Sequence, residues 1–505
     1  MSSLSWPEAP AEQSTLAPDT LCSIRNTLSL GGSLIATWTV ALGVRLILPR
    51  QLGPASFGAF QFADAFSAAF FVLTSLGVET YIRKEISTRK RHASDFLGGL
   101  LVLRVVTSVL VVGVMAALMH AAGRPAHLLQ LVMVFAVYQF FAGLNETGSA
   151  LLHAVGAVNG LAVLNVGTKL VWGAGILAAL WMGGGVEGVA VALASAEALK
   201  SAVLLVLVRR HLDLDLTVDF ARTVAVVTAS LPFYLNYLAH TVYGRLDVSL
   251  MSFLTTDVEV GWYGAAQNLA GIALLITPLM GWVLLPMFSR AAARSEQELD
   301  AVLRRTLEAV LSAAVPVSLL LGLGADVLIP VVFGPAFAPA VTSLRILAPM
   351  FILTYGAMVA ATALIRLERG WTVTKISLAG LGANALLNIL LIPACWSAFG
   401  RGGAGIGAAC VLITTEAGVA GAMLLLLGGR AFDARSVATL AKTAAACLVV
   451  LVAHHFMAGL GPVRIVADAA IYLALVVGLK AVRIGEAVDV VRLAMRQKGS
   501  YVGVS

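Results

Sequence analysis

The sequence has few charged residues and few cysteines for its length. Charged side chains make up 12% of the 505 residues, about half of the ~25% that is typical of soluble domains. Apolar side chains make up 59% and the mean hydropathy is +0.92, so water cannot be the main solvent of this chain. The cysteines are too widely scattered for a zinc site or a redox pair: Cys22, Cys395, Cys410 and Cys447.

The motifs of common enzymes are missing as well. The dipeptide Gly-Lys does not occur, which excludes a Walker A loop, and the His-Glu-x-x-His pattern of zinc proteases is absent. Residues 213–215 read DLD, like a metal–nucleotide motif of glycosyltransferases, but they lie in a short loop with no domain to hold a sugar nucleotide. Residues 403–407 read GAGIG, which small residues at a helix contact explain better than a nucleotide site. We therefore expect no enzymatic activity, no cofactor and no metal site.

Long apolar runs follow one another along almost the whole sequence. A helix needs ~20 mostly apolar residues to cross a membrane. The pattern predicts an all-α polytopic membrane helix bundle of about fourteen spans. The expected spans are 28–49, 57–82, 97–119, 127–152, 160–182, 187–208, 222–254, 262–287, 306–328, 342–365, 376–396, 404–427, 440–458 and 465–482.

The basic residues predict how these spans are oriented. If the N-terminus is cytoplasmic, the loops on that side hold most of the 34 lysine and arginine residues, and the opposite loops hold Arg50, Arg124, Arg401 and Arg464. This asymmetry predicts that both termini are cytoplasmic. The basic loops are expected to face anionic membrane lipids, not nucleic acid. Residues 1–27 lack the features of a cleavable signal and are expected to be a disordered cytoplasmic tail.

A weak internal repeat divides the chain. Residues 52–60 read LGPASFGAF and residues 258–266 read VEVGWYGAA, and each segment enters a predicted span when Gly58 is aligned with Gly261. Repeat-built transporters place their site between the repeats. The predicted units are a first six-helix lobe (28–208), a cytoplasmic linker (209–221), a second six-helix lobe (222–427), a terminal helix pair (428–482) and a cytoplasmic tail (483–505).

Ionisable side chains inside the spans are costly in hydrocarbon and usually face a cavity or a charged partner. A polar stripe follows one face of span 222–254, and Arg245 points nearly opposite to it. Asp64 belongs to a second stripe on span 57–82, and two stripes predict a hydrated cleft between the lobes. The predicted lumen residues are Arg45, Asp64, Asn236, His240, Tyr243, Asp247, Gln267 and Asn268, and Lys169, Glu197 and Glu416 are predicted coupling or structural charges. The alternative is that these charges only hold the bundle together, for instance as Arg45–Asp64 or Lys169–Glu197 pairs.

Five short segments carry a resemblance to a known family: LGPASFGAF at 52–60, LPFYL at 231–235, RLD at 245–247, VGWYGAA at 260–266 and FGPAFAPAVTSLRIL at 333–347. In these segments, and in its span count and orientation, the chain resembles the polysaccharide-biosynthesis flippases, the O-antigen and exopolysaccharide branch of the multidrug/oligosaccharidyl-lipid/polysaccharide exporter superfamily. The resemblance covers residues ~28–427.

The resemblance implies a two-lobed, alternating-access protein of the bacterial inner membrane. It implies a polyprenyl-pyrophosphate-linked oligosaccharide as substrate, and a polysaccharide polymerase and chain-length or export proteins as partners. Arg45 matches the basic lumen residues that this family places where a diphosphate or acidic sugar passes. A cation-coupled drug antiporter of the same superfamily is the alternative and would need an acidic lumen. A membrane glycan polymerase would need a large outer loop, and connectors such as 329–341 are too short for one.

Overall fold

The computed structural model describes the backbone of residues 16–86, 92–212 and 217–479, and side chains from residue 37 onward. A few side chains inside helices, among them Asn236 and His240, lie outside the described residues. All regular secondary structure in these ranges is helical. The longer helices are α1 (Leu16–Phe71), α3 (His92–Ala121), α4 (Ala126–Ala154), α5 (Val158–Trp181), α6 (Gly185–His211), α7 (Phe220–Leu254), α9 (Thr277–Arg294), α10 (Glu296–Leu323), α13 (Met350–Arg366), α14 (Gly370–Phe399), α15 (Gly403–Leu427), α16 (Ala434–Phe456) and α17 (Arg464–Gly478). The shorter ones are α2 (Val78–Glu85), α8 (Asp257–Ala270), α11 (Ala325–Phe333) and α12 (Ala340–Leu347).

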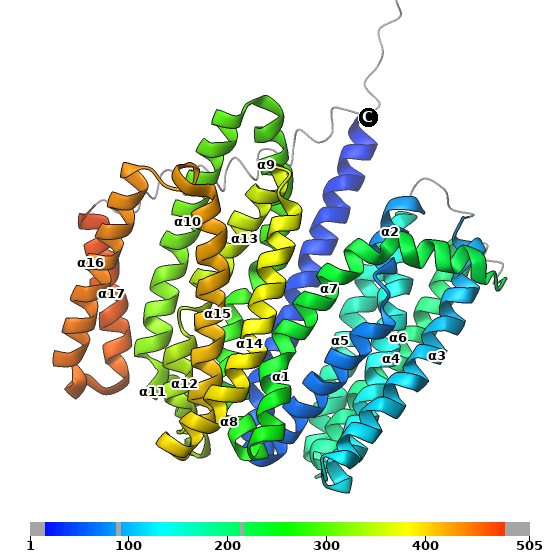
Figure 1. The fold of residues 1–505 in the computed structure, drawn as a ribbon, viewed down its shortest axis with the longest axis horizontal. Coiled ribbons are helices and arrows are strands. Elements are labelled where there is room, and N and C mark those ends of the chain that lie inside the picture. The colour runs from blue at the N-terminus through cyan, green and yellow to red at the C-terminus, as the bar shows by residue number, and fades with distance from the viewer. Residues whose placement is uncertain (1–15, 87–91, 213–216, 480–505) are drawn as a thin grey trace, which may run out of the picture.

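Helix α1 is folded back on itself and contains the first predicted span and the first part of the second. The two arms meet at Gly53, whose φ of 72° and ψ of 170° are not helical and suit glycine because it has no Cβ. The end of the bundle at which α1 turns is called the Gly53 end below, and it is the lower end in Figure 1. α1 begins at Leu16, inside the segment predicted as a tail. Its second arm stops at Phe71, so the predicted span 57–82 is not continuous.

Eleven helices in the described part of the chain are long and apolar enough to cross a membrane. One of them, Thr37–Thr74, includes parts of the first two predicted spans. The predicted span 262–287 runs through α8 and into α9, and the 3₁₀ segment Gly271–Ile276 joins the two helices. A 3₁₀ segment within a long helical stretch often marks a hinge. In chain order the helices follow the fourteen expected spans, and the protein is a polytopic membrane helix bundle.

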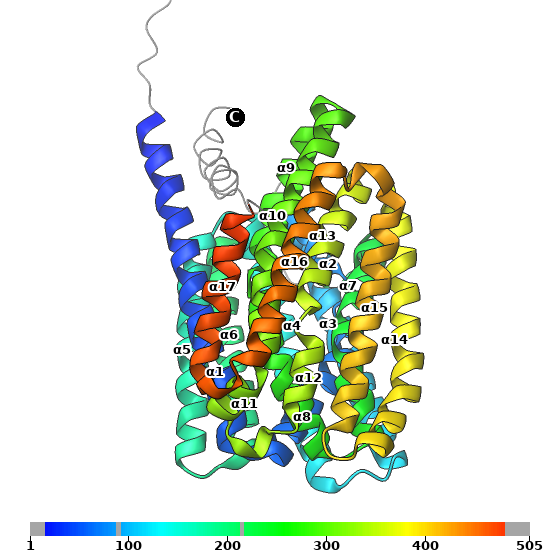
Figure 2. The same ribbon diagram turned by 90° about the vertical axis from the view of Figure 1, so that its left-hand side faces the viewer.

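The helices gather in two groups with α7 between them. In the first group α1, α4, α5 and α6 pack together, and in the second group α13, α14 and α15 do so, with α8 and α12 beside them. Helix α7 contacts α1, α2 and α3 on one side and α14, α15 and α8 on the other. The terminal helices α16 and α17 pack on each other and on α10, at the outer side of the second group (Figures 1 and 2). Because α7 packs on both groups, the boundaries of the two lobes stay a prediction.

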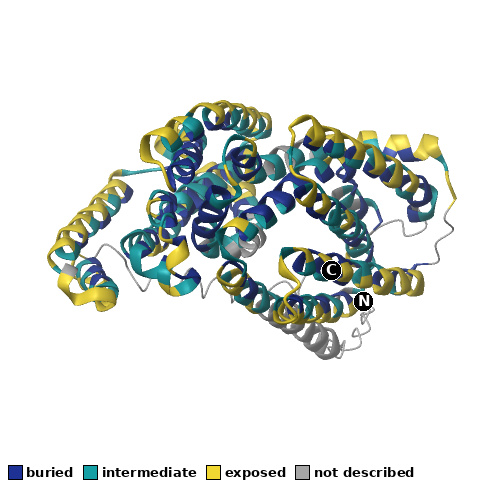
Figure 3. Cartoon of the chain, turned by 90° about the horizontal axis from the view of Figure 1, so that it is seen from below, coloured by how far each residue is buried: buried dark blue, intermediate teal, exposed yellow. Residues whose placement is uncertain are grey.

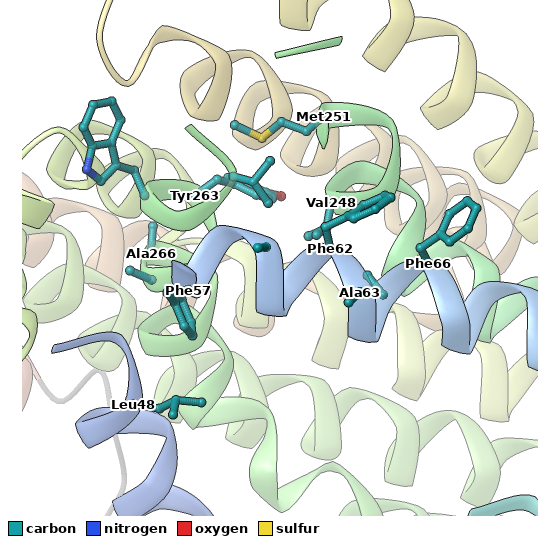
Figure 4. Packing of buried hydrophobic residues seen from close by; sticks show 14 of the residues in the cluster. Leu48, Phe57, Phe62, Ala63, Phe66, Val248, Met251, Tyr263 and Ala266 are labelled. Atoms are coloured by element: carbon teal, nitrogen blue, oxygen red, sulfur yellow. The ribbon is translucent and has the colours of Figure 1, made fainter. Parts of the chain in front are cut away.

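The two groups meet most closely at the Gly53 end. A Cβ on Gly58 would lie 1.7 Å from the carbonyl oxygen of Asp257, and a Cβ on Gly261 would lie 1.9 Å from the carbonyl oxygen of Pro54. The two glycines that the internal repeat aligns therefore let the backbones of α1 and α8 touch. Around this contact, Figure 4 shows apolar side chains of the second arm of α1 next to those of α7 and α8, all in one buried cluster: Phe57, Phe62, Ala63, Phe66, Val248, Met251, Tyr263 and Ala266.

The outer surface of the bundle is rich in large apolar side chains, unlike the surface of a soluble protein. Figure 3 shows exposed positions on the outward sides of the helices and buried ones between them. Many of the exposed side chains are large and apolar, such as Leu110 (63% exposed), Val163 (73%) and Leu425 (83%). Exposed apolar surface on this scale fits acyl chains as the surrounding solvent.

Arg104 on α3 is fully buried and fixes the break between α1 and α2. Its guanidinium donates to the carbonyl oxygens of Thr74 (3.2 Å) and Gly143 (2.5 Å), to the Thr147 hydroxyl (2.7 Å) and to the Glu79 carboxylate (3.0 Å). The carbonyl groups at a helix end have no partner within the helix. Arg104 satisfies them and pairs with a carboxylate at the same time, so this intramembrane charge is structural.

Candidate functional site

A cavity of about 580 Å³ lies between the two helix groups, next to their contact at the Gly53 end. Both arms of α1, together with α4, α5 and α6, form one side of it, and α7, α8, α13 and the 3₁₀ segment form the other. The polar side chains among its lining residues are Arg45, Gln61, Asp64, Tyr138, Lys169, Trp172, Arg245, Gln267 and Asn268. Five of these are residues that the sequence singled out: Arg45, Asp64, Lys169, Gln267 and Asn268. We call this space the central cavity.

The charges in the central cavity are mostly positive. Arg45, Lys169 and Arg245 line it, and Asp64 supplies the only carboxylate among the lining residues that the structure describes. The lining therefore carries two more positive than negative charges. A low-dielectric surrounding strengthens the field of such charges compared with water. The cavity is thus suited to a negatively charged group.

Asp64 and Arg245 form an ion pair across the cavity. Asp64 Oδ2, on the second arm of α1, lies 2.5 Å from Arg245 Nη1 on α7. The Gln139 amide on α4 donates to the other carboxylate oxygen of Asp64 at 3.4 Å. The two side chains keep 21% and 41% of their surface exposed, so a molecule in the cavity can reach both. The expected Arg45–Asp64 pair is replaced by this Asp64–Arg245 pair.

The other two cations lack a carboxylate partner within the described chain. The Lys169 ammonium lies 4.5 Å from the centre of the Trp172 ring, three residues later on α5, in a cation–π contact. The expected partner Glu197 instead accepts a hydrogen bond of 2.7 Å from the Asn145 amide and is buried. Arg45 is exposed toward the cavity. Arg45 and Lys169 are therefore available to an incoming anion.

The central cavity is closed at the Gly53 end by contacts that join the two groups. The Arg124 guanidinium, between α3 and α4, pairs with the Asp257 carboxylate at 3.2 Å and donates to the Ser252 carbonyl oxygen at 3.0 Å. It also lies over the rings of Phe62 and Phe253. These contacts and the Gly58–Asp257 contact make a compact seal.

The prediction that Asp247 is exposed to a water-filled lumen is wrong for this conformation. Asp247 is 2% exposed, and its carboxylate accepts hydrogen bonds from the Tyr263 hydroxyl and, at 3.1 Å, from the Gln267 amide, both on α8. Tyr243 points the same way, because its hydroxyl shares a 2.9 Å hydrogen bond with Thr415 on α15. This face of α7 therefore packs into the second group, and the face with Gly244, Arg245 and Val248 lines the cavity.

The remaining predicted residues lie elsewhere or outside the described side chains. Glu416 on α15 accepts a hydrogen bond of 3.3 Å from Thr354 on α13 and does not line the cavity. Asn236 and His240 belong to the side chains that are not described. Among the residues that sequence reasoning left out of its site, Arg245 is the most important. The signal that could have found it is an arginine inside a span, three residues before the position that the repeat aligns with Arg45.

Comparisons with known proteins agree with this architecture. The sequence matches the family described as polysaccharide biosynthesis protein over residues 23–292, slightly more than half of the chain. No curated protein matches it. The fold is similar to that of the lipid II flippase MurJ in an inward closed conformation, with a TM-score of 0.68, 11% identity, and coverage of 90% of this chain and 98% of that one.

Two solved MATE transporters also have a similar fold. One is a multidrug resistance MATE family transporter of the MOP superfamily in an inward-facing conformation, with a TM-score of 0.61, 16% identity, and coverage of 78% of this chain and 94% of that one. The other is a mutant of the Vibrio cholerae MATE transporter VcmN, with a TM-score of 0.54, 16% identity, and coverage of 82% and 98%. At these identities the likeness establishes a shared fold.

Proposed function

Because this chain belongs to the polysaccharide biosynthesis protein family, we propose that it is a flippase for a lipid-linked glycan. Its substrate is a polyprenyl-pyrophosphate-linked oligosaccharide, which it carries by alternating access from the cytoplasmic to the periplasmic leaflet of the bacterial inner membrane. The flipped glycan serves the synthesis of a surface polysaccharide. A polymerase and chain-length or export proteins are the proposed partners.

The observation that carries this proposal is the positive charge of the central cavity. A pyrophosphate group cannot enter hydrocarbon without losing water that nothing replaces. Arg45 and Lys169 are available to it, and Arg245 is accessible from the cavity. An arginine can donate two parallel hydrogen bonds to a phosphate, which makes the contact strong and orients the group. The cavity therefore supplies what the substrate's head group needs in place of water.

The rest of the cavity suits the sugar part of the substrate. The amides of Gln61, Gln267 and Asn268 line it and can donate to and accept from sugar hydroxyls. The aromatic rings of Tyr138 and Trp172 line it as well and offer flat faces to the apolar side of a sugar ring. The prenyl tail stays in the surrounding lipid, where apolar contact costs nothing.

The alternative is a cation-coupled antiporter of the same superfamily. Such a protein would need carboxylates that face the cavity. Asp247 and Glu197 are buried in hydrogen bonds within their own helix groups, and Asp64 is neutralised by Arg245. The distribution of charge therefore favours an anionic substrate.

In the proposed orientation the Gly53 end faces the periplasm and both termini lie in the cytoplasm. The sealed Gly53 end then corresponds to the state that receives substrate from the cytoplasmic leaflet. Since the sequence has no Walker A loop, we propose that an ion gradient or the consumption of flipped substrate gives the movement its direction.

The test is transport by an Arg45→Ala variant in the source organism. Surface polysaccharide should fall by roughly tenfold or more and the lipid-linked precursor should accumulate, because a lost charge-assisted contact costs about 1.5–3 kcal/mol. Arg45→Lys should be intermediate. Arg294→Ala is the matched control, since Arg294 is exposed and its one ion pair among the described residues is with Glu298 on the surface.

All amounts are normalised to protein in the membrane. Normal transport by a well-expressed Arg45→Ala variant would contradict the proposed anion site. A gene deletion that leaves the polysaccharide intact but makes cells sensitive to cationic drugs would favour the antiporter.

A further inference from the structure

Among the ion pairs of the described chain, Asp64–Arg245 is the one whose two side chains both line the central cavity. The two side chains belong to helices that lie on opposite sides of it. The other ion pair between the groups near the Gly53 end, Arg124–Asp257, lies outside the cavity lining. A molecule that fills the cavity therefore contacts Asp64–Arg245 directly and Arg124–Asp257 only through the protein.

An anion in the cavity and the Asp64 carboxylate compete for the same cation. Asp64 offers Arg245 one carboxylate, at 2.5 Å. A pyrophosphate offers several oxygens and more negative charge, and it also attracts Arg45 and Lys169, which the carboxylate leaves without an ion pair. Once the anion is bound, the negative Asp64 beside it is repelled. The anion and the Asp64–Arg245 pair thus exclude one another.

Losing this pair removes a link between the two helix groups. Asp64 belongs to the second arm of α1, the arm that also carries Gly58 and packs on α8. Arg245 belongs to α7, whose other face is held by Tyr263 and Gln267 of α8 and by Thr415 of α15. Breaking the pair removes one of the contacts that oppose separation of α1 from α7, while α7 stays held to α8 and α15. A ligand shifts the equilibrium between joined and separated helix groups only if it binds the two states with different affinity. Competition for Arg245 gives such a difference, because the anion binds better when the Asp64–Arg245 pair is broken.

We propose that Asp64 occupies the position of the substrate's anionic group in the empty cavity, and that its displacement from Arg245 couples substrate binding to separation of the two helix groups. This inference rests on the proposed function, because it requires an anionic substrate. It makes Asp64 a coupling residue and not a residue that holds the substrate. Its removal should therefore strengthen anion binding, which loss of a binding residue or a structural residue would not do.

The experiment measures binding and opening on the same purified full-length protein, with inorganic pyrophosphate as the probe. Spin labels are placed at Trp181→Cys and Phe399→Cys, two highly exposed positions at the Gly53 ends of α5 and α14, after the native cysteines are replaced. The distance between the labels reports opening of the Gly53 end. Titration calorimetry gives the affinity for pyrophosphate.

Two variants break the same pair with opposite effects on affinity. Asp64→Asn removes the competing anion and should tighten pyrophosphate binding by on the order of tenfold. Arg245→Gln removes a cation and should weaken it by a similar factor. Both should populate the longer label distance without pyrophosphate, and both should lose most of the further shift that pyrophosphate causes in the wild-type protein.

Asp257→Asn is the matched control. It breaks the Arg124–Asp257 pair outside the cavity, so it should favour the longer distance and tighten pyrophosphate binding only by as much as that shift accounts for, and it should keep a further response to pyrophosphate. If Asp64→Asn binds pyrophosphate no tighter than wild type, or keeps the full response, the coupling role is wrong while the proposed function stands. If the wild-type protein does not bind pyrophosphate at all, the anion site fails, and the proposed function with it.

Discussion

Adding one methyl group at Gly58 tests whether the contact between α1 and α8 holds the Gly53 end closed. In Gly58→Ala the new Cβ would lie 1.7 Å from the Asp257 carbonyl oxygen and 2.8 Å from the Gly261 nitrogen. Ordinary contacts between such atoms need about 3.5 Å, so the two helices must move apart by roughly 1.5 Å or more. The atoms in the way are backbone, which has no flexible end that can turn aside.

The steric clash in Gly58→Ala destabilises only the closed conformation. Overpacking of a well-packed contact typically costs about 1–3 kcal/mol, and we expect the upper part of this range because the clash is with backbone. Each 1.4 kcal/mol is a factor of ten in an equilibrium constant, so the ratio of closed to open protein should fall by roughly tenfold to a hundredfold. When the end is open, the two helices no longer touch and the methyl group has room.

The spin-label pair at positions 181 and 399 measures this ratio. Gly58→Ala should move a large part of the population to the longer distance in the absence of any ligand. Gly113→Ala is the control, because a Cβ on this α3 glycine meets nothing within 4 Å, and it should leave the distances unchanged. A Gly58→Ala protein with the same distance distribution as the control would refute the view that this glycine contact closes the cavity.

Two further predictions concern the rest of the fold. Arg104→Ala should lower the free energy of unfolding by about 3 kcal/mol, because it leaves the partly buried Glu79 carboxylate without its ion pair, and thermal melting in detergent should register this as a large fall in Tm that Arg294→Ala does not cause. For the topology, a cysteine placed at Ser295 should resist an impermeant thiol reagent in intact cells, whereas one at Ala122, at the Gly53 end, should react, and labelling at Ser295 would overturn the proposed orientation.

Much of the fold was open to prediction because the membrane imposes it. A chain that must satisfy its backbone groups without water forms helices, and the apolar runs mark where these lie. The breaks inside spans were not predictable in the same way. Both the stop after Phe71 and the 3₁₀ segment Gly271–Ile276 fall inside segments that were predicted as single spans, 57–82 and 262–287. They are fixed by local geometry and by partners such as Arg104, which lies far away in the sequence.

The residues of the candidate site were likewise predictable only in part. The sequence by itself determined which residues were too polar for lipid, and Arg45, Asp64 and Lys169 do line the cavity. Helical periodicity also placed Arg245 correctly on the face of α7 opposite to Asp247. Only the tertiary structure decided that the Arg245 face lines the cavity and that the Asp247 face packs against α8 and α15. Periodicity gives the angle between two side chains on one helix, but the helices that surround it determine which face meets the cavity.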